Sequence, residues 1–385
     1  MKPPEFYRGR EQTYLKHFFL EKYLERVAWN ILSFRDEFVY VDGFSGPWKS
    51  EDEKLEDTSF MIALNQLRKV RRGLKERQGR DVRMRCFFND NDEPAYNELA
   101  KAVSAVDDIE IKALCRDFED VVPEIVNYVG RSFSLTFIDP TGWTGFGLQK
   151  IESLLTLPGE VIINFMFDYV NRFLADPRPE IAATFDPLFG GPAWHLEVGR
   201  HTQAGHSRED AILIVYRDRL RKIGKFPHVT STRVLKPLAE RSYFHLVYGT
   251  RHWKGLVEFR NIEKKAIDEQ ERVRGVAKIT HRVERTSQTE LFGKGDEKLG
   301  PRSSDEERNK ELSAAHAKLQ EILSARGSCK YETLIGEILE IPLVWKSDLD
   351  SWLTNLRKGG QIEIPELKGR QRTPKPGHSI IWKAN

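Results

Sequence analysis

The chain has 385 residues, of which 39% are apolar and 11% aromatic, as is typical of a folded globular protein with one large and one smaller domain. Its longest apolar run, VIINFMF, has seven residues, whereas a membrane-spanning helix needs about 18 or more. We therefore expect a cytoplasmic protein without a membrane partner, and the oligomeric state stays open. The three cysteines, Cys86, Cys115 and Cys329, fit neither a zinc site nor a disulfide framework.

Five short apolar segments rich in strand-forming residues follow one another in the first half of the chain. They lie at residues 38–44, 84–90, 109–115, 134–140 and 160–167. The segments between them, such as AYNELAKAV, have the apolar spacing of helices. This alternation predicts an α/β fold, with a parallel sheet covered by helices on both faces.

The pattern changes after a stretch rich in Gly, Pro and His at residues 186–206. A helix is predicted at 209–223, followed by two strands at 229–238 and 243–251 that a short turn around Ala239–Arg241 makes antiparallel. Five parallel strands followed by a terminal hairpin form the sheet of the class I methyltransferases. This predicts a Rossmann-like domain over residues 1–281.

The end of the chain has a different organisation. Residues 282–309 are polar and contain almost no large apolar side chains, which predicts an interdomain linker. Residues 310–385 then contain three helical patterns and two short strands around the basic segment KGRQRTPKPG. This order predicts a small winged-helix domain, a fold that binds nucleic acid in some proteins and pairs with proteins in others.

Basic residues are unevenly distributed although the net charge is only +3. Nine basic residues and two acidic ones lie between Arg68 and Arg85, and seven basic and two acidic ones lie between Arg357 and the end. Two such segments predict a polyanionic partner, either DNA or RNA, although a solvated helix face and a soluble tail would look the same. The predicted nucleic-acid contacts are Arg71, Arg72, Lys75, Arg357, Lys358, Lys368, Arg370 and Arg372.

The first predicted strand ends in a turn with two glycines, in the stretch FVYVDGFSGPW. A glycine turn at this place brings a ligand close to backbone amides. The spacing matches neither a dinucleotide fingerprint nor a P-loop, which disfavours a nucleotide phosphate. The predicted cofactor contacts in this turn are Asp42, Gly43, Phe44 and Gly46, and the bulky Trp48 beside them either lines the pocket or closes it.

Acidic residues follow the next two strands. Asp90, with Asp92 as the second choice, is placed to hold the two hydroxyls of a ribose, although a turn before a helix has the same sequence. Asp117 could accept from an adenine amino group, and Phe118 could cover the ring. Acidic strand ends without a phosphate signature predict an adenosine ligand, S-adenosylmethionine.

The fourth strand ends in Asp139-Pro140-Thr141-Gly142-Trp143. Amino-directed methyltransferases have an Asp-Pro-Pro-aromatic turn here, which accepts a hydrogen bond from the target amine and stacks its base. This chain lacks the second proline and has its aromatic residue one position later. Asp139 is therefore the predicted catalytic acid and Trp143 the predicted stacking residue, the alternative being a turn that only shapes the pocket.

Three histidines, His195, His201 and His206, lie close together in the sequence. Spacings of six and five do not place them on one helix face, and no Cys or acidic partner accompanies them. They are interpreted as histidines of a surface loop, and no metal site is predicted.

Four motifs in order, VYVDGFSGP, FIDPTGWTG, INFMFDYVNRF and YFHLVYGTRHWKGL, resemble the three-Cys-motif partner proteins, known as TcmP. The similarity runs through roughly residues 10–290. It implies a methyltransferase-like protein that acts beside a radical-SAM-like three-Cys-motif protein of phage-related context, in nucleic-acid modification or DNA repair. The family commonly has Gly-Pro-Gly where this chain has Gly46-Pro47-Trp48, and Gly-Ser-Pro where it has Asp57-Thr58-Ser59.

Two functions therefore remain open. The first is a methyltransferase that uses S-adenosylmethionine and acts on DNA or RNA. The second is a non-catalytic partner that keeps the methyltransferase fold and positions nucleic acid. A winged helix that serves only self-association is a third possibility for the C-terminal segment.

Overall fold

The computed structural model describes residues 1–47, 50, 52–173, 178–286, 303–367, 371 and 373–383. Trp48 and three of the predicted nucleic-acid contacts, Lys368, Arg370 and Arg372, lie outside the described residues, as does most of the predicted linker. The chain divides into two units. One comprises Met1–Val229 and Arg233–Arg251, and the other comprises Thr230–Thr232 and His252–Asn385.

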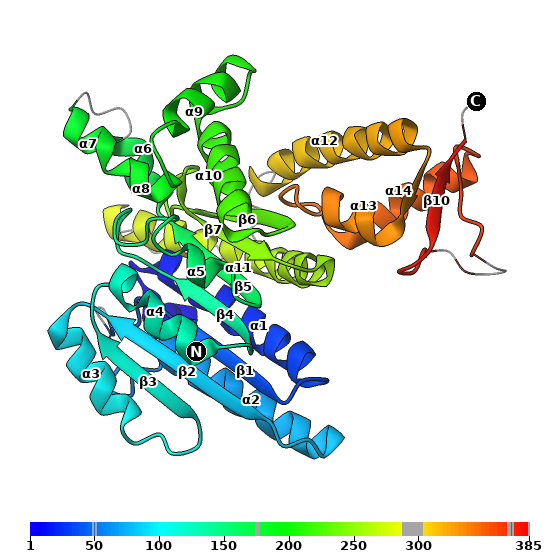
Figure 1. Ribbon diagram of the computed structural model, residues 1–385. Helices are drawn as coiled ribbons and strands as arrows, with labels where there is room; N and C mark the ends of the chain where they lie inside the picture. Colours follow the sequence, from blue (N-terminus) through cyan, green and yellow to red (C-terminus); the bar gives the residue numbers. More distant parts are fainter. Residues whose placement is uncertain are drawn as a thin grey trace. The chain divides into compact units, whose positions relative to one another are not determined.

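A seven-stranded sheet forms the centre of the first unit, with the order β3-β2-β1-β4-β5-β7-β6 (Figure 1). Strands β1 to β5 pair in parallel, and β7 is antiparallel to β5. The strands are β1 Glu37–Asp42, β2 Arg83–Asp90, β3 Glu110–Cys115, β4 Phe133–Ile138, β5 Gly159–Phe165, β6 His228–Leu235 and β7 Ser242–Thr250. This is the strand order of the class I methyltransferases, which confirms the predicted fold class.

Burial explains why these strands could be predicted from the sequence. Almost every residue of β1, β2, β4 and β5 is buried, because parallel strands with helices on both faces have no solvent-facing side. In the register of the sheet Asp42 lies beside Phe88 of β2 and Phe137 of β4. The carboxyl ends of these three neighbouring strands therefore meet at one edge.

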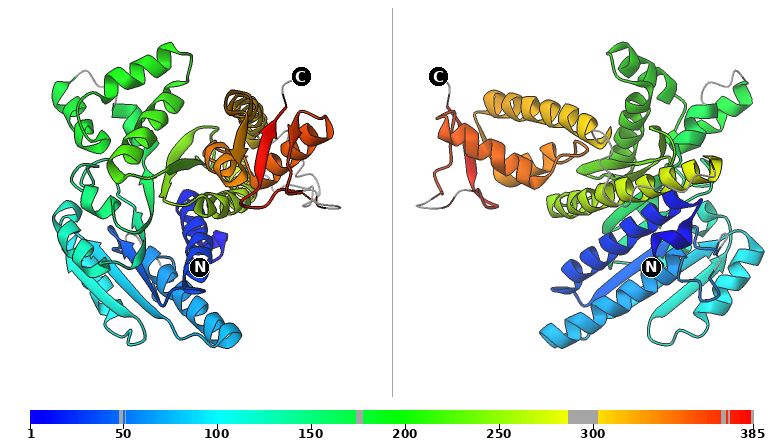
Figure 2. Two further views of the ribbon diagram at one scale, coloured as in Figure 1. Left: turned by 45° about the vertical axis from the view of Figure 1, so that its right-hand side comes forward. Right: turned by 180° about the vertical axis from the view of Figure 1, so that it is seen from behind.

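One face of the sheet is covered by two long helices, α1 Glu11–Leu32 and α2 Ser59–Gln78, which pack on each other and on β1. The view from behind in Figure 2 shows them side by side. The chain enters α1 through a short 3₁₀ helix, η1 Pro4–Tyr7, and Thr58 caps α2 by accepting from Met61 N at 3.4 Å. Helix α1 was not among the elements predicted from the sequence.

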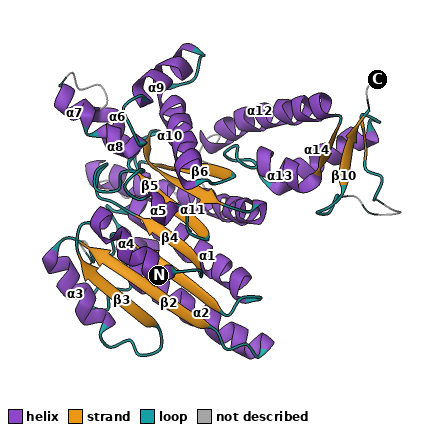
Figure 3. Ribbon diagram, in the orientation of Figure 1, coloured by secondary structure: helices purple, strands orange, loops and turns teal. Residues whose placement is uncertain are grey.

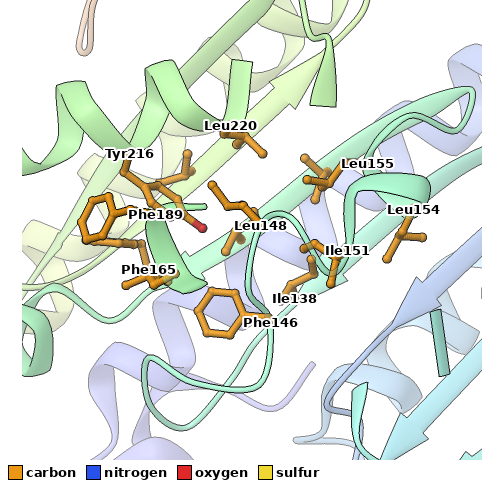
Figure 4. Packing of buried hydrophobic residues seen from close by; sticks show 14 of the residues in the cluster. Ile138, Phe146, Leu148, Ile151, Leu154, Leu155, Phe165, Phe189, Tyr216 and Leu220 are labelled. Carbon is orange, nitrogen blue, oxygen red and sulfur yellow. The ribbon is translucent and has the colours of Figure 1, made fainter. Parts of the chain in front are cut away.

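The other face carries α4 Phe118–Val129, α5 Glu152–Leu155 and α10 Arg208–Gly224, while α3 Glu93–Val103 packs on β2 and β3. Figure 4 shows the core between β4, β5, α5 and α10, where Ile138, Phe165 and Leu220 are buried. Each such side chain contributes about 1.5–3 kcal/mol when it leaves water. This apolar layer supports the edge of the sheet at which the strands end in acidic residues.

Four short helices join β5 to α10: α6 Phe167–Phe173, α7 Pro179–Ala183, α8 Phe185–Phe189 and α9 Trp194–Gln203. The prediction of a loop is wrong for His195 and His201, which lie on α9, whereas the exposed His206 follows this helix in a loop. Trp194 and Val198, four residues apart, are buried and hold this helix on the core. Among the described residues no group of His, Cys, Asp or Glu is arranged to hold a metal ion.

The second unit contains α11 Trp253–Thr286, α12 Ser303–Arg326, β8 Ser328–Lys330, α13 Tyr331–Ile338, α14 Lys346–Lys358, β9 Ile362–Glu363 and β10 Ser379–Trp382. From α12 onward the order is helix, strand, two helices and two strands, which is the winged-helix arrangement (Figure 3). Its sheet has the order β8-β10-β9, so it contains one strand more than the predicted hairpin. The predicted domain boundary at residue 281 falls inside α11.

Candidate active site

The glycine turn after β1 is held against the neighbouring strands by backbone hydrogen bonds. Gly43 N donates to Phe137 O at 3.1 Å, and Ser45 N donates to Asn89 O at 2.9 Å. A Cβ atom on Gly43 would lie 2.5 Å from the ring of Phe118. The packing of the protein itself therefore requires glycine at this position.

The second glycine of the turn lies against the carboxylate of Asp90. Gly46 N donates to Asp90 Oδ2 at 2.7 Å, and Asp92 N donates to Asp90 Oδ1 at 3.0 Å. Asp90 thus joins the turn to the end of β2, and each of its oxygens keeps a second lone pair. Asp92 instead caps α3 by accepting from Ala95 N at 3.0 Å. Asp90 is therefore the better placed of the two predicted ribose contacts.

Asp42, the last residue of β1, is completely buried and belongs to a cluster of three carboxylates. Burial raises the pKa of Asp42 to about 7. Hydrogen bonds from Ser59 and from Phe44 N oppose this shift, and the charges of Asp139 and Asp90 add to it. The carboxyl ends of β1, β2 and β4 thus place the charges of Asp90 and Asp139 within electrostatic reach of Asp42.

Two asparagines that the sequence analysis did not identify connect these strand ends. Asn89 is buried, and its Nδ2 donates to Gly43 O at 3.2 Å and to Arg116 O at 2.9 Å. Asn91 Nδ2 donates to Asp117 Oδ1 at 2.9 Å. Asp117 is exposed at the start of α4, so its second oxygen can accept from a ligand. The signal in the sequence was an asparagine on each side of Asp90, one in the last buried part of β2 and one directly after it.

The predicted adenine-covering residue lies in the core instead. Phe118 is only 2% exposed, and its ring lies 5.2 Å from that of Phe44. The Phe118 ring supports the glycine turn. The geometry therefore does not favour the predicted contact between Phe118 and the ring of a ligand. Phe44 is half-buried and lies above Phe118 at the end of the turn.

Asp139, directly after β4, has one partner on each oxygen. Asn164 Nδ2 of β5 donates to Oδ1 at 2.7 Å, and Lys16 Nζ of α1 lies 2.5 Å from Oδ2. The buried Oδ1 of Asn164 has no hydrogen-bond partner among the described residues. Lys16 and Asn164 could not be predicted as partners of Asp139, because their contacts with it depend on how α1 and β5 pack.

Trp143 is fixed by an aromatic cluster. Its ring stacks on Phe185 at 5.4 Å and 20° and lies 4.9 Å from the ring of Phe173. Its Nε1 donates to Thr184 Oγ1 at 3.0 Å. Trp143 is half-buried, and it follows Asp139 by four residues.

The basic segment between Arg68 and Arg85 is largely paired within the protein. Arg68 binds Asp108 through both Nε and Nη2, at 2.9 and 2.7 Å, and Arg71 Nη2 lies 2.6 Å from the same carboxylate. These side chains line a hollow of about 430 Å³. Arg72 and Lys75 also line it, are exposed, and form no ion pair with any residue the structure describes.

The remaining cations of this segment have partners of their own. Lys69 pairs with Glu25, Arg80 with Asp36, Arg83 with Glu110 and Arg85 with Glu37, while Arg77 lies over Trp29. In the second unit Arg357 Nη1 donates to Gln371 O at 3.5 Å, and Lys358 is exposed. Much of the positive charge counted in the sequence is therefore already neutralised in the fold.

Comparisons with known proteins find solved structures with a distant likeness to this chain. No family model matches the chain, and no curated protein matches it. A solved structure of a protein from Legionella pneumophila str. Philadelphia 1, described by the family model DUF519, has a TM-score of 0.34 and 11% identity over 61% of this chain and 85% of that one. A loganic acid methyltransferase solved with SAH has a TM-score of 0.30 and 9% identity over 74% of this chain and 91% of that one. The site must therefore be judged from its own geometry.

Proposed function

We propose that this chain is an S-adenosylmethionine-dependent methyltransferase that acts on nucleic acid, DNA or RNA. The observation that carries the proposal is the cluster of Asp42, Asp90 and Asp139 at the carboxyl ends of β1, β2 and β4. The order of the strands reverses between β1 and β4, and open α/β sheets bind ligands at such a switch point.

The side chains present fit the proposed cofactor. Both oxygens of Asp90 keep a lone pair beside the glycine turn and can accept from the hydroxyls of a ribose. The exposed Asp117 can accept from an adenine amino group. When bound, S-adenosylmethionine would supply a methyl group on a positively charged sulfur, and an acidic environment favours a cation.

Asp139 and Asn164 have the chemistry to orient an amine. A carboxylate oxygen and the unpartnered amide oxygen of Asn164 lie at the ends of adjacent strands, and both are hydrogen-bond acceptors. They can accept the hydrogens of an amino group and direct its lone pair. Trp143, held by its aromatic neighbours, would stack a base beside them.

Transfer of a labelled methyl group tests this proposal. The full chain is incubated with S-adenosylmethionine carrying a radiolabelled methyl group and with single-stranded DNA or RNA. We expect label in the nucleic acid. With Asp139→Asn the transfer of label should fall about 100-fold or more, because the positioning of a reacting group by a side chain can contribute an effect of this size. Absence of label in all nucleic acids despite cofactor binding would contradict the proposal.

A non-catalytic role is the second candidate, and the ion pair of Lys16 with Asp139 favours it. A lysine ammonium lies where the target amine would bind, so a protein without turnover could keep this arrangement permanently. This role predicts nucleic-acid binding that survives Asp139→Ala and no methyl transfer. Measurements of methyl transfer and of nucleic-acid binding therefore separate the two functions.

The proposed setting of this activity rests on the resemblance to the TcmP proteins. It includes a radical-SAM-like three-Cys-motif protein as partner and a role in nucleic-acid modification or repair. Co-purification of this chain with such a protein would support it. No helix in the described part of the chain is both long and apolar enough to cross a membrane.

A further inference from the structure

A cationic side-chain cluster outside the strand-end site surrounds Asp168, the second residue of α6. The carboxylate of Asp168 contacts Arg172 at 3.1 Å, Lys236 at 2.9 Å and Arg241 at 3.0 Å. These cations come from α6, from the end of β6 and from the turn into β7. One nearly buried carboxylate thus gathers three cations from three elements.

Two of the cations that contact Asp168 reach solvent. Asp168 is only 9% exposed at its side chain, but those of Arg172 and Arg241 are 59% and 65% exposed. Burial would raise the pKa of Asp168, but the hydrogen bonds from Lys236 and Arg241 lower it overall. The carboxylate therefore stays ionised and orients the cations, and the guanidinium groups of Arg172 and Arg241 face solvent.

Aromatic rings alternate with these cations. Arg172 lies 5.7 Å from the ring centre of Tyr169, and Lys236 lies 5.7 Å from that of Tyr243. Both tyrosines are half-buried. Cations that track a backbone and aromatic rings that stack bases are the combination by which proteins bind single-stranded nucleic acid.

The cluster is continuous with the proposed acceptor site. The ring of Tyr169 lies 6.4 Å from that of Trp143, which follows Asp139 in the same turn. Asn164, which binds Asp139, precedes Asp168 by four residues along β5 and α6. An acceptor strand that contacts Arg172 therefore lies next to the residues proposed to orient its amine.

We propose that Arg172, Lys236, Arg241, Tyr169 and Tyr243, here called the Asp168 surface, bind the phosphodiester backbone and bases of a single-stranded nucleic acid. The inference rests on the proposed function for its choice of ligand. It differs from the sequence-based prediction in moving the main contact from the Arg68–Arg85 segment, whose cations are mostly paired, to the side of Trp143.

Fluorescence anisotropy with labelled single-stranded oligothymidylate and the full chain tests this inference. The double variant R172E/R241E should weaken binding about tenfold or more and should reduce the salt dependence, because two phosphate contacts are lost. The matched control R72E/K75E reverses two exposed, unpaired cations of the Arg68–Arg85 segment and should change affinity less than about threefold. R172Q/R241Q provides a milder variant if charge reversal disturbs folding.

Two further readouts make the outcome decisive. Tyr169→Ala should weaken binding of the single strand more than that of the matching duplex, because only unpaired bases can stack. Calorimetry should show unchanged cofactor affinity in R172E/R241E. Wild-type affinity in R172E/R241E, or a larger loss in R72E/K75E, would overturn the inference. Loss in R172E/R241E without any cofactor binding to the wild type would uphold the Asp168 surface and contradict only the methyltransferase proposal.

Discussion

Lys16 Nζ lies 2.5 Å from Asp139 Oδ2, so an ammonium group from α1 occupies the carboxylate proposed to orient the acceptor. Both side chains are poorly exposed, at 15% and 12%, which strengthens the pair relative to one on the surface. The positive charge of Lys16 also disfavours the binding of a second cation nearby. The positively charged sulfur of the proposed cofactor must therefore bind against this charge.

Replacing Lys16 should consequently favour the charged cofactor. With Lys16→Met we expect S-adenosylmethionine to bind more tightly by about 1 kcal/mol, the scale of one unit charge at several ångströms in a partly screened site. The neutral S-adenosylhomocysteine should change less, so the ratio of the two dissociation constants, measured by calorimetry, should shift severalfold. Lys22→Met, at a more exposed lysine of the same helix, should leave the ratio unchanged.

Asp42 predicts how stability depends on pH. Its pKa in the folded protein is raised to about 7, so the folded state holds the proton more tightly than the unfolded state. The stability due to the neutral carboxyl is therefore complete below about pH 4 and is lost as the pH rises through about 7.

The variant Asp42→Asn is neutral throughout and should not show this loss. Urea unfolding of both proteins between about pH 5 and pH 8.5 should show the wild type losing 1–4 kcal/mol relative to the variant, as the size of such a shift implies. Asp36→Asn, at a side chain that is 91% exposed, serves as the control. Parallel pH curves for wild type and Asp42→Asn would show that Asp42 does not titrate in this range.

The glycine turn should not tolerate a side chain. A methyl group on Gly43 would meet the Phe118 ring at 2.5 Å, and overpacking of this kind costs about 1–3 kcal/mol. We expect Gly43→Ala to lower the melting temperature, and to weaken cofactor binding if the turn moves. Gly199→Ala, on α9 with nothing within 4 Å of the added carbon, should instead be neutral or stabilising.

A buried hydrogen-bond network between α1 and the sheet should contribute to stability. Tyr23 Oη donates to Glu160 Oε2 at 2.7 Å, and Thr250 Oγ1 donates to the other oxygen at 2.9 Å. Tyr23→Phe removes one donor from a buried carboxylate and should lower the free energy of unfolding by about 1–3 kcal/mol. Tyr96→Phe, at a half-buried tyrosine of α3, is the control, and equal effects of the two variants would contradict this reading.

The strands of the sheet could be predicted from the sequence, but the contacts within the site could not. The buried strands β1, β2, β4 and β5 appear as apolar runs ending in polar residues, and all seven strands of the large sheet, including the hairpin of β6 and β7, could be predicted. The three-residue strand β8 is too short for any periodicity to show. Helix α9 was missed because its Gly and His content resembles a loop, while its burial rests on Trp194 and Val198.

The partners of the predicted acids depend on tertiary packing. Asp90 and Asp139 could be named because they end strands, but no pattern indicates that Lys16 reaches Asp139 or that Asn164 lies beside it. Likewise the pairing of Arg68 and Arg71 with Asp108 brings together residues about 40 positions apart. Charge counts along the sequence therefore overstated the free positive charge of that segment.

Calorimetric titration of the full chain with S-adenosylmethionine tests the proposed cofactor site most directly. We expect one molecule to bind the wild type, and Asp90→Asn to weaken binding about tenfold, because an amide replaces one of two acceptors for the ribose. Asp92→Ser, which keeps the cap of α3, should bind like the wild type. No binding to the wild type at millimolar cofactor, or equal affinity in Asp90→Asn, would contradict the proposed site.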